Sequence, residues 1–357
     1  MAFIINLLFG YFAFSVYDNK YGKTSYWTSL LILAPFFIWW VLLIGGQYFV
    51  GTDYGSYLSI FDGTGNLWLY ELKGEYLFYY LVSGGQALGL SGQDFFYIFA
   101  AFFALLYWKI SRSITTRNHA LFFFLFVAVS TLFHNQMNIL RQSCAIYLIT
   151  LAFISLAKNR KLSFLALILI ASGFHQSSIV ILIFFFFRNI RLGSYFAKVC
   201  LVAATLISFA SIEPWIKEIV SSISTYAHYA DSNFVESTSL INKLTKLSLF
   251  PVYFLCTNLL KKESYLSPIE MKLFQLGFLT YMLRSVFLVS SVSNRIGYFF
   301  LLTAIFPLFY YLRYLKENDR KSFWIICCYL LFIYLLKIVV FPSKEYLYSS
   351  IYPFLFN

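Results

Sequence analysis

Charged residues are scarce in this chain of 357 residues. Asp, Glu, Lys and Arg make up 12% of it, whereas hydrophobic residues make up 60%. A soluble domain carries about 25% charged and about 45–50% apolar residues. So few charges cannot cover the surface of a soluble globule, and so many apolar side chains cannot stay unfolded in water. The composition excludes a soluble enzyme and a disordered chain, and it indicates a membrane protein.

Several binding signatures are also missing from the sequence. The five cysteines lie within apolar stretches, without a Cys-x-x-Cys pair or a nearby histidine, so we expect small buried side chains there. There is no glycine-rich phosphate loop, no clustered His and Cys, and no polar segment large enough for a nucleotide-binding domain. We therefore expect no cofactor and no metal. We also expect no nucleic acid, because the basic residues are dispersed in small groups.

Long apolar runs dominate the sequence. A membrane span needs about 20 predominantly apolar residues, and by that measure we predict an all-α polytopic membrane protein with about 12 transmembrane helices. We expect residues 1–357 to form a single integral membrane domain, and we expect the first helix to be retained, because it lacks the basic start of a signal peptide. The predicted spans are residues 1–17, 27–46, 94–110, 119–134, 141–157, 162–175, 177–188, 197–211, 246–260, 271–290, 296–314 and 322–341.

Lys and Arg concentrate in alternate connections between these spans. Six loops hold 18 of the 27 basic residues but only five of the 15 acidic ones. Because cytoplasmic loops carry the excess of Lys and Arg, we predict that these six loops are cytoplasmic and that the other connections face outward. The six loops are residues 18–26, 109–118, 158–161, 188–198, 261–272 and 313–321.

Two predicted outer loops, residues 47–93 and 212–245, are far longer than the usual helix connections of about 2–8 residues. The first contains a short apolar segment, 75–90, that Gly84 and Gly85 interrupt. If this segment crossed the membrane, the later basic loops would face outward, against the charge rule. We therefore predict a re-entrant or amphipathic helix near 75–90 on the outer face.

Polar side chains in or beside the predicted spans are costly in a bilayer and are therefore functional candidates. On the predicted topology they all lie in the outer half of the membrane or at its outer edge. Scattered structural residues would not all choose one leaflet, so we expect convergence on one site. The set comprises His134, Asn138, Arg141, Gln142, His175, Gln176, Arg284, Asn294, Arg295 and Lys337.

The arginines of this set suit a phosphate or diphosphate, because a guanidinium is always charged and offers forked donors. Arg141 and Arg295 each open a predicted span, where snorkelling to the membrane surface is the alternative role. Arg284 lies about two turns inside its helix, and it could bind an anion or pair with an acid such as Asp53 or Glu75.

Two residues are candidates for acid–base chemistry. His175 lies in a tight outer turn and can take a proton from a sugar hydroxyl near neutral pH. Asp53 lies in a glycine-containing turn and could act as base, orient a histidine or bind sugar hydroxyls. A purely structural role is the alternative for both. The other candidates, for substrate binding, are Glu75, Tyr54, Asn138, Gln142, Gln176 and Asn294.

Five short motifs follow one another along residues 1–310. They are Gly51-Thr52-Asp53-Tyr54-Gly55-Ser56-Tyr57 with Phe61 after it, Glu75-Tyr76-Leu77-Phe78-Tyr79-Tyr80-Leu81, Leu140-Arg141-Gln142, Phe174-His175-Gln176-Ser177-Ser178 and Asn294-Arg295. In this order and with this sidedness the chain resembles the EpsG/Wzy family of bacterial exopolysaccharide and O-antigen polymerases. The residues that match the recurring polar positions of that family are Asp53, Arg141, His175 and Arg295.

The resemblance implies a multi-pass glycosyltransferase of the bacterial cytoplasmic (inner) membrane. Such an enzyme joins undecaprenyl-diphosphate-linked oligosaccharide repeat units on the outer face, among membrane lipids and with a chain-length regulator as a candidate partner. We expect Arg141, Arg295 and Arg284 to bind the diphosphate, and His175 or Asp53 to act as base or to orient it. The donor is already activated, so no cofactor is needed.

Two other functions stay open. A flippase or transporter of lipid-linked oligosaccharide would need charged residues along a path through both leaflets, whereas the predicted inner leaflet is apolar. An O-antigen ligase or a membrane acyltransferase would share chemistry at the outer face.

Overall fold

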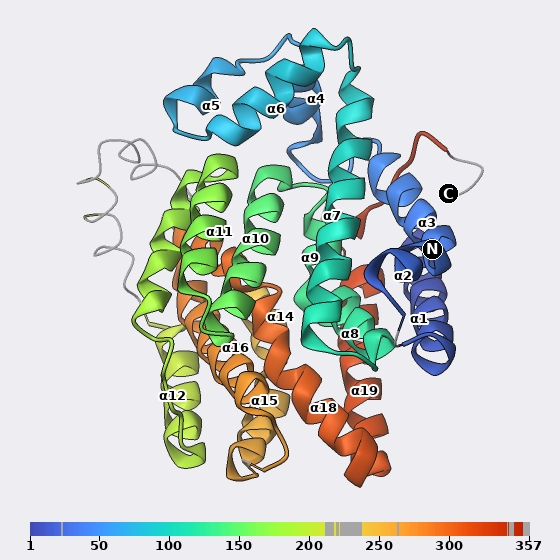
Figure 1. Cartoon of the computed structure of the whole chain (residues 1–357). Coiled ribbons are helices and arrows are strands. Elements are labelled where there is room, and N and C mark those ends of the chain that lie inside the picture. Colours follow the sequence, from blue (N-terminus) through green and yellow to red (C-terminus); the bar gives the residue numbers. More distant parts are fainter. Residues whose placement is uncertain are drawn as a thin grey trace. The chain divides into compact units, whose positions relative to one another are not determined.

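The computed structural model (Figure 1) describes residues 1–22, 24–210, 218, 221, 238–262, 264–340, 342 and 346–352. Apart from one isolated bridge between Gln47 and Ser350, these residues form helices, turns and bends. The all-α class is confirmed. The chain divides into two compact units, one of Met1–Phe185 with Cys327–Asn357 and the other of Phe186–Ile326. The single integral membrane domain stays a prediction.

The first unit is built around α10, which packs against α7 and α11, while α7 also packs against α3. The side chains of α10 are almost entirely buried, so this helix forms the core of the unit. The elements of the unit are α1 (Ala2–Lys20), α2 (Tyr26–Ile32), α3 (Ala34–Gly45), α4 (Tyr54–Phe61), α5 (Trp68–Leu72), α6 (Tyr76–Ala87), α7 (Gly92–Ile114), α8 (His119–Leu125), η1 (Phe126–Ser130), α9 (Leu132–Asn135), α10 (Leu140–Ala157), α11 (Lys161–Phe174), η2 (Gln176–Phe185) and η8 (Leu336–Val340).

The second unit is organised around α16, which packs against α12, α17 and α18. The helix α19 begins in the second unit and ends in the first. The elements are α12 (Ser194–Ile207), α14 (Leu240–Leu247), α15 (Phe250–Cys256), η4 (Thr257–Lys261), α16 (Pro268–Val286), η5 (Phe287–Val289), α17 (Ser291–Gly297), η6 (Tyr298–Phe300), η7 (Thr303–Ile305), α18 (Phe306–Asn318) and α19 (Arg320–Leu335).

Four described helical stretches are long and apolar enough to cross a membrane, or six if each of two bent pairs counts as one span. In one bent pair, Pro35 lies in the first turn of α3 and cannot donate a backbone hydrogen bond, so α2 ends before it and the pair bends by 70°. The predicted figure of about 12 spans is not confirmed, because several apolar helices are shorter than a bilayer requires. The four stretches are Gly92–Ile114, Leu140–Ala157, Pro268–Val289 and Arg320–Val340.

The predicted span 119–134 is interrupted. A π-helical turn, η1, ends at Thr131, whose φ of 62° lies in the left-handed region that a β-branched residue rarely adopts. The Thr131 hydroxyl accepts a hydrogen bond of 3.1 Å from the Asn135 side chain. The break separates α9 from the preceding helix and leads directly into the turn before α10.

The helix predicted near 75–90 is present as α6. Its 12 residues span about 18 Å at 1.5 Å per residue, which is too short to cross a bilayer. Phe78 and Val82 are buried on one side, whereas Tyr76 and Tyr80 are exposed on the other. Figure 1 shows α4, α5 and α6 gathered at one end of the first unit, crosswise to α7. Their placement on the outer face stays a prediction.

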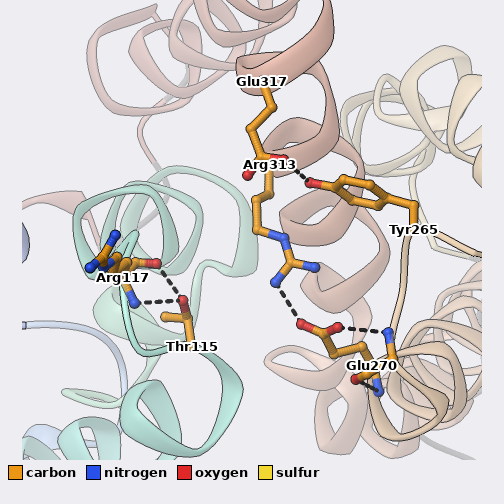
Figure 2. A network of polar contacts seen from close by, with 7 residues as sticks. Thr115, Arg117, Tyr265, Glu270, Arg313 and Glu317 are labelled. Atoms are coloured by element: carbon orange, nitrogen blue, oxygen red, sulfur yellow. Dashed lines mark hydrogen bonds and ion pairs between the residues drawn. The ribbon is translucent and has the colours of Figure 1, made fainter. Parts of the chain in front are cut away.

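Loops that are predicted to share the cytoplasmic side meet within each unit. In the first unit, Arg112 donates to the Thr24 carbonyl at 2.9 Å. In the second, Figure 2 shows Arg313 donating to Glu270 at 2.6 Å and Tyr265 donating to Glu317 at 2.8 Å. Which end faces the cytoplasm stays a prediction. The predicted outer loop 212–245 lies largely outside the described residues, which include only 218, 221 and 238–245 of it.

Candidate functional site

A buried carboxylate, Glu75, is the centre of the candidate site. It stands immediately before α6, and its side chain is 4% exposed. One oxygen, Oε2, accepts a hydrogen bond from Arg141 in the first turn of α10. The other, Oε1, lies 2.9 Å from His175 Nδ1 and 3.3 Å from the backbone nitrogen of Gln176, at the turn between α11 and η2. Two segments that are distant in sequence, the start of α10 and the turn after α11, therefore meet at the carboxylate of Glu75.

The position of Glu75 depends on a close approach between two helices. Gly173, near the end of α11, faces Leu77 of α6, and a Cβ at residue 173 would lie 2.7 Å from Leu77 Cγ. Glycine is thus required for α6 to come this near to α11. The backbone N–H of Glu75 also donates to the Tyr70 carbonyl at 2.8 Å, which closes the turn between α5 and α6.

The contact with Glu75 determines which ring nitrogen of His175 carries the hydrogen. An ionised carboxylate only accepts hydrogen bonds, so Nδ1 of His175 must carry the hydrogen. In the neutral imidazole the lone pair then resides on Nε2. The His175 side chain is 25% exposed, whereas Glu75 is buried behind it. This is the arrangement in which a carboxylate orients a histidine for proton transfer.

Arg141 is enclosed by aromatic rings as well as by Glu75. Its guanidinium carbon lies 4.4 Å from the centre of the Tyr70 ring and 5.6 Å from that of Phe78, which are cation–π distances. The guanidinium also bonds to the Tyr57 hydroxyl. The Nε of Arg141 is buried and has no hydrogen-bond partner among the described residues. A planar cation with a remaining donor is suited to an anionic ligand.

The surroundings keep Glu75 ionised. Burial by itself raises the pKa of this carboxyl group, but the hydrogen bond from His175 and the positive charge of Arg141 outweigh burial and lower the pKa below its ordinary value of 4.5. Burial likewise raises the pKa of Tyr57 to about 12, although Arg141 acts in the opposite direction. At neutral pH the site therefore contains a carboxylate, a guanidinium and an uncharged phenol.

Asp53 lies in a loop that Asn138 holds. The Asn138 Oδ1 accepts the backbone N–H groups of Thr52 and Asp53, both at 2.8 Å. The Asp53 carbonyl in turn accepts the N–H of Tyr57 at 2.9 Å, so Asp53 begins α4. Because Tyr57 bonds to Arg141, this loop belongs to the same site, and Asp53 acts electrostatically on both Tyr57 and Tyr70.

A comparison with protein families assigns the chain to one family. The model of the EpsG family matches residues 29–356, which is nearly the whole chain. The chain belongs to the EpsG family. Neither the curated proteins nor the solved structures gave a match. Membership confirms the resemblance inferred from the motifs, and it indicates a membrane protein of polysaccharide biosynthesis with a glycosyltransferase-like, polymerase-related role.

Two other predicted substrate-binding residues of this EpsG-family chain lie close by along the sequence. Gln142 is buried in the first turn of α10, directly after Arg141. Tyr54 is buried in the first turn of α4, where its hydroxyl donates to Gln93 at 3.2 Å and its ring stacks on Phe96 at 4.9 Å. These contacts support the fold of the loop that carries Asp53.

His134 and Lys337 are not part of the Glu75 site. The ring of His134 packs against Phe3 and Tyr346, each at 4.6 Å between ring centres. Its Nε2 lies 3.2 Å from the Tyr334 hydroxyl. Lys337 is buried and acts electrostatically on this histidine. Both belong to a separate aromatic cluster of the first unit.

The remaining predicted residues, Arg284, Asn294 and Arg295, belong to the second unit. Arg284 is buried in the last turn of α16 and lies next to Gly297 of α17. A Cβ at residue 297 would be 3.7 Å from the Arg284 Cγ. Asn294 and Arg295 lie in α17, and Asn294 Oδ1 accepts a hydrogen bond of 3.0 Å from Lys246 in α14. The structure thus brings the three predicted residues to neighbouring helices, together with Lys246.

Sequence reasoning missed four contributions. It assigned Glu75 to substrate binding but did not identify its contacts with Arg141 and His175. It also gave no role to Tyr57, although this residue ends the first motif, and it did not single out Tyr70 or Lys246. For Lys246 a signal existed, because it is the first residue of the predicted span 246–260 and Lys243 lies three positions before it. Among the described residues no group of three or more His, Cys, Asp or Glu side chains could hold a metal ion.

Proposed function

We propose that this EpsG-family protein is a polysaccharide polymerase that joins undecaprenyl-diphosphate-linked oligosaccharide repeat units. The proposal places the reaction at the outer face of the bacterial cytoplasmic membrane, in a multi-pass protein with about 12 passages. The observation that carries it is the shared carboxylate of Glu75, which joins a forked cation, Arg141, to a partly exposed histidine, His175. Transfer of a glycosyl group from a lipid diphosphate needs a proton acceptor and a positive charge, and this cluster offers both.

In the proposed reaction, a hydroxyl oxygen of the acceptor sugar attacks the anomeric carbon of the donor. The new glycosidic bond forms while the bond from that carbon to the diphosphate oxygen breaks. Nε2 of His175 accepts the hydroxyl proton, because Glu75 holds the hydrogen on Nδ1 and stabilises the imidazolium that forms. Asp53 is assigned to the acceptor sugar, whose hydroxyls a carboxylate can bind.

The departing diphosphate requires positive charge. The Arg141 side chain is 19% exposed, and its guanidinium is held by Glu75. A cation that is already held in place stabilises the leaving group without further reorganisation. In the second unit, Arg284 and Arg295 keep the diphosphate-binding role that the sequence predicts, and Lys246, which bonds to Asn294, is added to them.

The test is an elongation assay with purified protein in lipid nanodiscs and undecaprenyl-diphosphate-linked repeat units, supported by polymer length in a polymerase-deficient host. His175→Ala removes the proton acceptor, and Glu75→Gln keeps the shape of Glu75 but not its charge. We expect each variant to lower the elongation rate about 100-fold or more. The matched control is Glu270→Gln, which alters the Glu–Arg pair of the second unit and should keep more than half of the rate.

Full-length polymer from both His175→Ala and Glu75→Gln at normal protein level would refute the assignment. Deletion of the gene separates the polymerase from its alternatives. Single repeat units on the final lipid acceptor indicate a polymerase, whereas polymer that accumulates on undecaprenyl diphosphate indicates a ligase. Repeat units trapped on the cytoplasmic side indicate a flippase.

A further inference from the structure

The backbone of the loop Gly51–Asp53 is held by one side-chain oxygen, the Oδ1 of Asn138. Asn138 is 6% exposed, and its Oδ1 accepts two consecutive backbone N–H groups, those of Thr52 and Asp53. The Thr52 hydroxyl lies 3.4 Å from the same oxygen and also donates to the Asp53 carboxylate at 3.0 Å. The acceptor that fixes the backbone of Asp53 is therefore a residue 85 positions later in the chain.

This contact depends on a residue without a side chain at position 51. Gly51 has a φ of +78°, and a Cβ there would lie 2.4 Å from Asn138 Oδ1. Only glycine allows both the left-handed backbone and the close approach. Successive N–H groups in such a turn form a concave site for an acceptor atom, and in this protein the Asn138 oxygen fills it.

Asn138 also lies three residues before Arg141, in the turn that leads into α10. The backbone of this turn is fixed, since the N–H groups of Asn138 and Ile139 both donate to the Asn135 carbonyl at 2.9 Å. One residue therefore joins the loop of Asp53 to the start of the helix that carries Arg141. The Asp53 carbonyl then starts α4, whose Tyr57 bonds to Arg141.

We propose that Asn138 is a positioning residue of the polymerase, which acts by holding Asp53 at a fixed place at the start of α4, the helix whose Tyr57 bonds to Arg141. Its role is to accept the two N–H groups, and Asp53 is the group that meets the acceptor sugar. This inference rests on the proposed function, but it assigns Asn138 differently from the substrate-binding role that the sequence predicts. A displacement of about 1 Å in a reacting group can cost about 100-fold in rate.

Two substitutions distinguish these roles. Asn138→Asp keeps an oxygen that can accept both N–H groups but loses the amide donors, whereas Asn138→Leu has a similar size and no acceptor. Positioning predicts that Asn138→Asp elongates within about 3-fold of wild type, and that Asn138→Leu loses about 10- to 100-fold, mostly in kcat rather than in KM. If the amide donors bind the sugar, Asn138→Asp fails as badly as Asn138→Leu, and the inference is overturned.

A double-mutant cycle with Asp53→Asn separates positioning from a general structural role. If Asn138 acts through Asp53, Asn138→Leu has little further effect once Asp53 is replaced, whereas independent effects multiply. If the effects of Asn138→Leu and Asp53→Asn on the elongation rate multiply in the double variant, the inference is overturned. The control is Asn135→Leu in the same turn, which loses the bond to Thr131 and should retain elongation. If the Asn138→Leu protein does not accumulate in the membrane, Gly51→Ala tests the contact between Asn138 and the loop from the other side. It should lower the elongation rate by the same factor.

The result is separable from the proposed function itself. If His175→Ala and Glu75→Gln abolish elongation while Asn138→Leu retains the wild-type rate, the polymerase assignment holds and the role of Asn138 is refuted. If none of these variants changes the elongation rate, the proposed function fails first.

Discussion

Each of the two units contains a Glu–Arg pair, and the two pairs differ in what they contact. Glu75 bonds to Arg141 in the first unit, and Glu270 bonds to Arg313 in the second (Figure 2). Each carboxylate stands at the beginning of a helix. The Glu270 side chain is 23% exposed, whereas that of Glu75 is 4% exposed.

The difference lies in how each carboxylate uses its oxygens. Glu270 belongs to a capping box, in which its Oε2 accepts the N–H of Ser267 at 2.9 Å, so it stabilises its own helix. Glu75 occupies the N-cap position of α6 but makes no side-chain capping bond. Its oxygens instead bond to residues of α10 and of the turn after α11. Glu75 therefore does not cap its own helix and bonds instead to a distant arginine and a distant histidine. A catalytic role explains this placement better than a role in stabilising α6.

The largest difference between the two pairs is expected when the arginine of each pair is replaced in turn. Arg141→Ala leaves a buried carboxylate without its cation, which costs about 3–5 kcal/mol, and we expect elongation to fall by about 100-fold or more. Arg313→Ala leaves Glu270, which is 23% exposed and still accepts the N–H of Ser267, so it should cost less than Arg141→Ala, with elongation retained. Thermal unfolding in detergent and the elongation assay measure both quantities. Equal losses in the two variants would show that the pairs do not differ in role.

A smaller effect is expected from two glycines near or in α6. Gly173→Ala would force α6 away from α11 by its contact with Leu77, at a cost of about 1–3 kcal/mol, and it should slow elongation because α6 carries Glu75. The matched change, Gly84→Ala, meets no atom within 4 Å and lies in α6 itself. We expect it to stabilise the helix by about 0.5–1 kcal/mol. Unfolding temperatures that shift alike in both variants would contradict the close packing of Gly173.

The smallest expected effect concerns pH. The folded-state pKa of Glu75 is lowered, so its charge stabilises the folded protein fully above pH 4.5, and this contribution is lost as the pH falls through the lower folded value. Wild-type protein should therefore lose stability relative to Glu75→Gln as the pH falls below about 4.5. Unfolding of both proteins between pH 6 and pH 3 measures this difference. A constant difference across that range would show that Glu75 does not titrate as described.

The sequence predicted most residues of the site, but it did not predict which of these residues contact one another. Asp53, Glu75, Arg141 and His175 were all candidates because polar groups beside apolar runs are costly and therefore informative. The sequence left open whether Arg284 pairs with Asp53 or Glu75, and the structure pairs Glu75 with Arg141 and His175 instead. Asn138 was assigned to substrate, because nothing in the local sequence indicates that its oxygen faces a loop 85 residues earlier.

Composition and hydropathy alone determined that this chain is helical and enters a membrane, because burial of apolar side chains in lipid depends on each segment by itself. Only the tertiary structure decided which ends of these helices meet. Glu75 is separated from Arg141 by 66 residues and from His175 by 100. Contacts of this kind depend on the relative placement of helices, on the close approach at Gly173 and on the turn at Gly51, which a one-dimensional pattern does not contain.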